Sequence, residues 1–226
     1  MGMTIAQKII AAAAGVGEAK VGDIHTVELD RLMSNDGTTH LTIDMFNKLK
    51  NKKIADVDKL VWIVDHNVPC DSVKTAASHK KMRDFAKEYG IKFYEGAGVC
   101  HQVMMENHVT SGELIFGADS HTCAYGAVGA FGTGVGCTDY LYAMVTGKSW
   151  LLVPETLRFN LTGKLPEGVY DVCRIYYGCI SLKEVPTFTF KVGNTTYVAP
   201  EVKEAFHNAD DKAAGIYRYQ TTIKVA

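Results

Sequence analysis

Short apolar runs alternate with amphipathic and polar stretches over residues 1–169, a pattern typical of an α/β protein. Residues 60–64 and 114–116 are apolar without interruption, and each run is predicted to be a buried strand. Residues 71–89 carry apolar side chains at helical spacing, and residues 91–94 are predicted to form the next strand. A strand, a helix and a strand at this spacing imply a right-handed crossover and therefore a parallel sheet.

The predicted helix over residues 71–89 has one apolar and one polar face. Its apolar face is formed by Val73, Ala76, Ala77, Phe85, Ala86 and Tyr89. Its lysines and His79 fall on the opposite face, so His79 is predicted to be solvated and without a role.

Further elements follow from start and stop signals along the chain. Thr4 and Gln7 form a capping box for a helix that Gly15 ends. Thr138 is predicted to cap a helix that ends at Gly147. Strands are expected over residues 24–29 and 157–161, and a helix from 102 to 107.

Residues 170–226 are predicted to form a separate small α+β domain, to which the sequence assigns no function. Alternation over residues 187–192 and 195–198, around Gly193-Asn194, predicts a two-residue hairpin. Pro200 is predicted to open a helix that Gly215 closes, and residues 217–225 alternate as a strand.

Composition excludes several classes of protein. The 226-residue chain has a net charge of −1, so no electrostatic signal indicates nucleic acid or an anionic membrane. No apolar run reaches the roughly 18 residues of a membrane span, and the N-terminus lacks signal-peptide features. We therefore expect a cytoplasmic protein. The cysteines lie at positions 70, 100, 123, 137, 173 and 179 without a C-x-x-C pair, which favours reduced thiols and identifies no metal-ligand set.

Polar side chains with acid/base chemistry stand where the predicted strands end. Asp65-His66 follows the first apolar run, and Asp119-Ser120-His121 follows the second. His101 lies between them, beside the pair Gly96 and Gly98. Carboxylates that orient and charge imidazoles are typical of general acid/base sites. The alternative is that some of these groups only cap helices or end strands.

Residues 126–136 are unusually rich in glycine. Gly132-Thr133-Gly134 lacks the third glycine of a dinucleotide fingerprint, because Cys137 stands at that position. Gly147-Lys148-Ser149 resembles the end of a phosphate loop, but Tyr142 occupies the place of the first glycine. These glycines are better explained as positions where helices and strands approach the site closely.

Four ordered motifs resemble the aconitase superfamily, and within it the large subunit of 3-isopropylmalate dehydratase and its homoaconitase relatives. They are residues 65–69 (DHNVP), 98–102 (GVCHQ), 117–122 (GADSHT) and the glycine run that ends at 136–139 (GCTD), with residues 35–40 (NDGTTH) fitting the same pattern. The resemblance covers residues 1–169. It implies a three-layer α/β/α domain with a mostly parallel sheet.

The resemblance also implies roles for individual residues. His66, held by Asp65, would protonate the departing hydroxyl of a hydroxy di- or tricarboxylic acid. His101, Asp119 and His121 would surround that hydroxyl or a water molecule. His40 and Ser120 would bind the substrate. The expected activity is that of a hydro-lyase, with 3-isopropylmalate of leucine biosynthesis as the first substrate to test.

The family's [4Fe-4S] cluster is the main departure. The resemblance implies a cluster held by three cysteines from a later part of the large subunit, whose open iron acts as a Lewis acid. Matching cysteines are not found in this sequence, so we expect a small-subunit or cluster-bearing partner chain. Two alternatives stay open: an inactive aconitase-like fragment that binds a partner or a carboxylate, and a dehydratase that uses acid/base groups alone.

Overall fold

The computed structural model describes residues 2–162, 188–192, 195–199, 205–206, 216–222 and 224–225. The chain divides into two compact units. The sheet unit comprises Ile9–Gly17 and Ile24–Leu151, and the second unit comprises Met1–Lys8, Glu18–Asp23 and Leu152–Ala226. The domain boundary predicted after residue 169 lies outside the described residues and stays a prediction.

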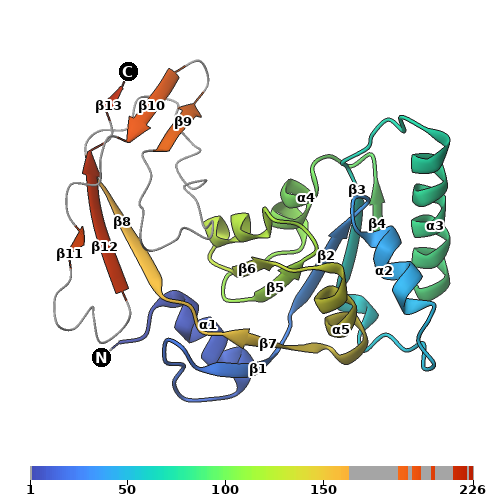
Figure 1. Ribbon diagram of the computed structural model, residues 1–226, viewed down its shortest axis with the longest axis horizontal. Helices are drawn as coiled ribbons and strands as arrows, with labels where there is room; N and C mark the ends of the chain where they lie inside the picture. Colours follow the sequence, from blue (N-terminus) through green and yellow to red (C-terminus); the bar gives the residue numbers. More distant parts are fainter. Residues whose placement is uncertain are drawn as a thin grey trace. The chain divides into compact units, whose positions relative to one another are not determined.

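A five-stranded parallel sheet forms the centre of the sheet unit, as the strand, helix, strand pattern predicts (Figure 1). Its strands, in spatial order, are β4 (Lys92–Glu95), β3 (Leu60–Val64), β2 (Arg31–Asn35), β5 (Leu114–Gly117) and β6 (Phe131–Gly134). All residues of β3 and β5 are buried, which explains why both read as continuous apolar runs. Strand β2 is central, with β3 and β5 as its neighbours.

Helices cover both faces of this sheet, which confirms the three-layer α/β/α fold (Figure 1). On one face lie α2 (Thr39–Phe46), α3 (Val73–Tyr89) and α5 (Cys137–Thr146), and on the other lie α4 (Cys100–Asn107) and the 3₁₀ helix η2 (Thr122–Val128). Trp62 of β3 stacks on Phe85 of α3 and donates a hydrogen bond to the Tyr140 hydroxyl of α5. Its neighbours Val61 and Ile63 point the other way and join the apolar core formed with α4 and η2.

The first helix, α1 (Ile5–Ala14), begins and ends as the sequence predicts. Thr4 and Gln7 exchange backbone-to-side-chain hydrogen bonds of 2.8 and 3.2 Å, which confirms the capping box. Gly15 follows the helix with a φ of 68°. Strand β1 (Ile24–Glu28) pairs with β7 (Lys148–Leu152), a strand that the sequence does not predict. A short 3₁₀ helix, η1 (Val57–Lys59), precedes β3. None of the described helices is both long and apolar enough to cross a bilayer.

The face assigned to helix α3 is wrong at four positions. Val73, Ala76 and Ala77, placed on the apolar face, are exposed, and Val73 is 90% exposed because Ser72 caps the helix and leaves Val73 in its first turn. His79, predicted to be solvated, is buried and hydrogen-bonded to Asp36. A polar side chain can lie on a buried face when a partner elsewhere in the chain satisfies it.

Helix α2 begins at Thr39 and takes His40 into its first turn. One other local prediction is corrected. Helix α5 begins at Cys137 with Gly136 as its N-cap, and no side-chain cap is present, so Thr138 does not cap it. Gly147 ends α5 in the left-handed region, as predicted.

The glycine run permits the close approach that we expect of it. A Cβ at Gly132 would lie 2.3 Å from the Thr122 carbonyl oxygen, and one at Gly134 would lie 2.6 Å from the Asp119 carbonyl oxygen. Strand β6 can therefore pack against the 119–122 segment only with glycine at these positions.

The second unit contains the remaining described strands. Strands β9 (Phe188–Val192) and β10 (Thr195–Ala199) are antiparallel, with Thr195 opposite Val192, which confirms the two predicted hairpin strands. The turn at 193–194 lies outside the described residues. Strand β12 (Ile216–Thr222) pairs in parallel with β8 (Thr156–Thr162), and β13 (Lys224–Val225) pairs with β10. The helix predicted from Pro200 to Gly215 is wrong at β11 (Ala205–Phe206), which is a strand paired with β12, and its other residues lie outside the described ones.

Candidate active site

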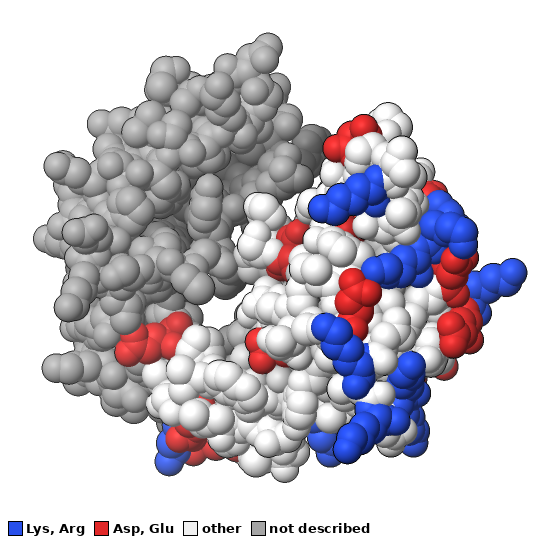
Figure 2. Space-filling model, turned by 45° about the vertical axis from the view of Figure 1, so that its right-hand side comes forward, with Lys and Arg blue, Asp and Glu red and all other residues white. Residues whose placement is uncertain are grey.

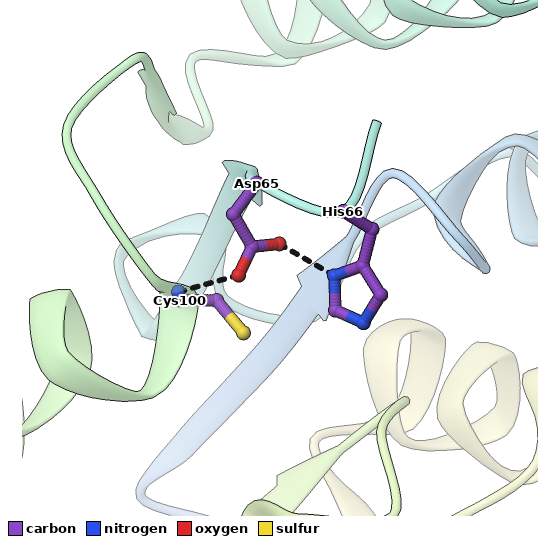
Figure 3. Close-up of side chains that lie close together, drawn as sticks. All are labelled: Asp65, His66 and Cys100. Carbon is purple, nitrogen blue, oxygen red and sulfur yellow. Dashed lines mark hydrogen bonds and ion pairs between the residues drawn. The ribbon is translucent and has the colours of Figure 1, made fainter. Parts of the chain in front are cut away.

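The first half of the site follows β3, where the chain leaves the sheet. Asp65 lies between two partners in Figure 3: its Oδ1 is 2.7 Å from His66 Nδ1, and its Oδ2 accepts a 2.6 Å hydrogen bond from the Cys100 amide. The Asp65 side chain is nearly buried, whereas 44% of the His66 side chain is exposed. Asp65 therefore fixes the imidazole through Nδ1, and Nε2 is left to contact another group.

The charges around His66 favour its protonated form. Burial alone lowers the pKa of His66, but the hydrogen bond that its ring donates to Asp65 and the charges of Asp65, Asp119 and Asp36 raise the pKa above the ordinary value. An imidazole with a raised pKa is a proton donor near neutral pH.

The second half of the site centres on Asp119, which follows β5. Its carboxylate is 8% exposed and lies 2.9 Å from His101 Nε2 and 3.5 Å from His121 Nδ1. It also accepts hydrogen bonds from the His121 amide at 2.7 Å and from Asn35 Nδ2 at 2.9 Å. The hydrogen bond from His101 lowers the pKa of Asp119 most, burial opposes it, and the His121 amide and Asn35 lower it further, so the carboxylate is ionised.

The two halves meet at His66 and Asp119. His66 Nε2 lies 3.3 Å from Asp119 Oδ2, although the two residues are 53 positions apart in the chain. The parallel sheet explains this proximity, because β3 and β5 lie on either side of β2 and their carboxyl ends are at the same edge of the sheet. The structure thus brings together all five predicted acid/base residues: Asp65, His66, His101, Asp119 and His121.

The two predicted substrate-binding residues lie at the margin of this group. Ser120 is exposed, with its Oγ 3.5 Å from His121 Nδ1. His40 is partly buried and its Nδ1 lies 3.3 Å from the Asp36 carbonyl oxygen. Among the interactions of the described residues, no hydrogen bond or ion pair joins His40 to the five acid/base residues. The catalytic and substrate-binding roles stay predictions.

Four residues of the site are not singled out by the sequence. Asn35 and Asp36 bind the acid/base loops from β2, His79 binds Asp36, and the Tyr125 hydroxyl lies 3.2 Å from His101 Nδ1. Asn35 and Asp36 belong to the 35–40 stretch that fits the family pattern, but the pattern assigns neither of them a role. Two adjacent polar residues were the only local signal, and it is weak because β2 has little strand character in its own sequence.

With this geometry established, comparison with known proteins identifies the family. The Aconitase family (aconitate hydratase) matches residues 7–172, which include every acid/base residue described above. The chain therefore belongs to the aconitase family.

Curated relatives share this part of the chain. It is 47% identical over 173 residues to the probable 3-isopropylmalate dehydratase large subunit of Methanothermobacter thermautotrophicus, and 48% identical to the 3-isopropylmalate dehydratase large subunit 1 of Methanopyrus kandleri. It is 43% identical to the 2,3-dimethylmalate dehydratase large subunit of Eubacterium barkeri. Each match covers 75% of this chain but 41% of the relative, so the chain spans less than half the length of these relatives.

Family membership implies a [4Fe-4S] cluster, and the described cysteines do not fit one. Cys70 is exposed, Cys100 is buried, and Cys123 and Cys137 each face a backbone carbonyl. Burial raises the pKa of the Cys100 thiol, so it stays protonated. Among the described residues, two groups of three could each hold a metal ion. One group is Asp65, His66 and Cys100, and the other is His101, Asp119 and His121. Neither group holds more than one cysteine, whereas a cluster requires several thiolates.

We expect the purified chain to bind no iron-sulfur cluster after anaerobic reconstitution with iron and sulfide. The physical reason is the dispersal of the described thiols, each of which lies among protein groups and not beside another thiol. Iron and sulfide content and the visible absorption spectrum measure the outcome. A stoichiometric cluster absorbance that disappears in Cys100→Ser or Cys123→Ser would contradict it.

Proposed function

We propose that this chain supplies the acid/base part of a hydro-lyase that removes water from, and adds it to, a hydroxy di- or tricarboxylic acid. The observation that carries the proposal is the contact between the Asp65–His66 pair and the Asp119 carboxylate, with His101 and His121 around it. The names of the relatives support 3-isopropylmalate as the first substrate to test, with 2,3-dimethylmalate as the second.

In the dehydration direction, His66 protonates the departing hydroxyl from Nε2. Asp65 holds Nδ1 and stabilises the imidazolium form, so the proton is available near neutral pH. In the hydration direction the neutral ring accepts the proton back.

The other residues orient the reacting groups. Asp119 is ionised and accepts from His101, so it holds that imidazole with Nε2–H directed at the carboxylate. His101, Asp119 and His121 thereby surround the position of the hydroxyl or water. Ser120 and His40 are proposed to hydrogen-bond a substrate carboxylate or hydroxyl.

A companion chain belongs to the proposal. The relatives are named large subunits, which supports a small-subunit partner, and the scattered cysteines support a partner that carries a cluster. The face of the sheet unit in Figure 2 shows Lys and Arg mixed with Asp and Glu, not gathered by sign. Ion pairs such as Lys81–Asp44 and Arg83–Glu95 contribute to this mixture. We therefore propose a small-molecule substrate and a protein partner, without nucleic acid or membrane.

The second candidate is an aconitase-like module without catalytic activity, which binds a partner protein or a carboxylate. The specific observation in its favour is the described cysteine set, which does not fit the family's cluster. Both candidates use the same fold, so activity must distinguish them.

The test is dehydratase turnover with and without a partner. General acid/base groups contribute about 10²- to 10⁴-fold in rate, whereas enzymes typically reach at least about 10⁶-fold. We therefore expect no detectable turnover of 3-isopropylmalate, homocitrate or dimethylmalate by the chain alone. The absorbance of the unsaturated product measures the turnover. Adding a cluster-bearing partner should restore turnover.

The contrary outcomes separate the alternatives. Strong activity of the chain alone in the presence of a chelator would contradict the two-chain proposal and favour a dehydratase that uses acid/base groups only. Inactivity with every plausible partner would favour the binding module.

A further inference from the structure

The central strand β2 ends between the two halves of the site. Its neighbours are β3, which leads to Asp65 and His66, and β5, which leads to Asp119. Asn35, the last residue of β2, and Asp36, which follows it, are both buried polar residues. Consecutive residues at this point can contact both neighbouring loops.

Asn35 is bound to the Asp119 half. Its Nδ2 donates a 2.9 Å hydrogen bond to Asp119 Oδ2, and its Oδ1 accepts a 3.0 Å hydrogen bond from the Gly37 amide. The Gly37 bond holds the Asn35 amide group in one orientation, with Nδ2 toward Asp119. Asn35 therefore positions the carboxylate oxygen that faces His66.

Asp36 is bound to the His66 half. Its fully buried carboxylate accepts hydrogen bonds from three successive backbone amides in the 65–67 turn. Asp36 Oδ1 accepts from Asp65 at 3.0 Å and from His66 at 2.9 Å, and Oδ2 accepts from the amide and the side chain of Asn67, both at 2.9 Å. The turn that carries His66 is thus fixed by one side chain.

His79 completes the environment of Asp36 from helix α3. Its side chain is 2% exposed, and its Nε2 lies 3.1 Å from Asp36 Oδ2. An ionised carboxylate only accepts hydrogen bonds, so Nε2 carries a hydrogen and donates it. The other ring nitrogen, Nδ1, lies 3.1 Å from the Cys70 sulfur. The hydrogen bonds described for the Asp36 carboxylate therefore come from the 65–67 turn and from helix α3.

We propose that Asn35 and Asp36 are positioning residues that set the separation between the His66 imidazole and the Asp119 carboxylate, and that His79 fixes Asp36 in this task. The catalytic importance of this positioning rests on the proposed function, because His66 and Asp119 are the acid/base pair of that proposal. Neither Asn35 nor Asp36 is proposed to exchange protons with the substrate.

The contacts distinguish positioning from general support of the fold. A residue that only stabilises the sheet unit would, on removal, loosen both halves of the site together. Asn35 and Asp36 have separate partners, so each removal should loosen only its own half. The proposal therefore predicts that removing Asn35 affects the Asp119 half and not the His66 half, and that removing Asp36 does the reverse.

The experiment measures amide hydrogen exchange in the chain alone by NMR. In Asp36→Asn, the Asp65, His66 and Asn67 amides should exchange at least about 10-fold faster, the equivalent of one net hydrogen bond, while the His121 amide stays within about 3-fold. In Asn35→Ala, the His121 amide, which donates to Asp119, should exchange faster while the 65–67 amides do not. Asp44→Asn is the matched control, because Asp44 is exposed and pairs with Lys81.

His79 provides variants that keep Asp36 in place. Gln can donate a hydrogen bond as His79 does and Leu cannot, so His79→Leu should accelerate the 65–67 amides and His79→Gln should restore part of their protection. If Asp36→Asn does not fold, this pair decides the question. Equal acceleration of both halves in each variant, or no rescue by Gln, would overturn the proposal. The readout needs neither substrate nor partner, so absence of dehydratase activity leaves it unaffected and counts only against the proposed function.

Discussion

Replacing His66 by Ala is expected to reduce turnover of the partner-restored dehydratase by about 10²- to 10⁴-fold, which corresponds to ~3–5 kcal/mol of transition-state stabilisation. His66 is the imidazole that Asp65 orients and whose Nε2 faces Asp119, so its loss removes the proposed proton donor. The fold should tolerate the change, because 44% of the His66 side chain is exposed and its backbone amide still reaches Asp36. The measurement is kcat and KM with 3-isopropylmalate, beside circular dichroism and partner binding.

His108→Ala is the control for His66→Ala. His108 follows the opposite end of helix α4 from Cys100, and its Nε2 contacts the Tyr94 hydroxyl. Turnover by this variant should stay close to that of the unmodified chain. If His66→Ala keeps turnover within about 3-fold while partner binding is intact, His66 is not the proton donor and the assignment is wrong.

Acid is expected to unfold the chain through two carboxylates of the site, Asp36 and Asp119. Burial alone would raise the pKa of Asp36, but hydrogen bonds from the 65–67 turn and from His79 hold the pKa well below its ordinary value. The hydrogen bond from His101 likewise lowers the pKa of Asp119. The unfolded chain therefore binds protons before the folded chain as the pH falls. The stability from both groups is complete above about pH 4 and is lost progressively below it.

His66 gives the stability the opposite dependence on pH. Its pKa is raised in the folded chain, so its contribution is complete below the unfolded value of about 6.5 and is lost as the pH rises through the folded pKa. We therefore expect maximal stability between about pH 4 and pH 6.5. Urea unfolding followed by tryptophan fluorescence at a series of pH values measures this profile.

Asp36→Asn isolates the contribution of Asp36 to the acid effect. It leaves donors of the 65–67 turn and His79 without acceptors in a buried site, so the free energy of unfolding at pH 7 should fall by ~3 kcal/mol. The steep loss of stability below about pH 4 should become shallower, because a carboxyl group with a strongly lowered pKa is gone. Asp44→Asn should change neither quantity appreciably. If Asp36→Asn loses stability below about pH 4 as steeply as the unmodified chain, the assignment of this loss to Asp36 is wrong.

Much of the fold could be predicted from local signals. The runs at 60–64 and 114–116 are strands because they are buried on both faces, and a fully buried strand has no polar positions to obscure the pattern. The capping box of Thr4 and Gln7 forms within four residues, so its prediction needs no tertiary information. The short strands β2, β6 and β7 were missed because their polar or glycine-containing sequences have little strand character of their own, and pairing with neighbours makes them strands.

The candidate site also depends partly on local sequence and partly on tertiary structure. The sequence by itself determined which ionisable residues follow the strands, because Asp-His and Asp-Ser-His directly end the apolar runs, and it made them the candidates for acid/base chemistry. Only the tertiary structure decided that β2 separates β3 from β5, and hence that His66 meets Asp119 across the end of β2.

The burial of Asp36 and His79 was also decided by the tertiary structure. Helical periodicity assigns His79 to the solvent from its neighbours in sequence, and it carries no information about a carboxylate 43 residues away. Burying either polar group alone is unfavourable, but the pair, completed by the amides of the 65–67 turn, satisfies each donor with an acceptor. That compensation exists only when β2, β3 and α3 are assembled, which is the physical reason why the sequence pattern could not reveal it.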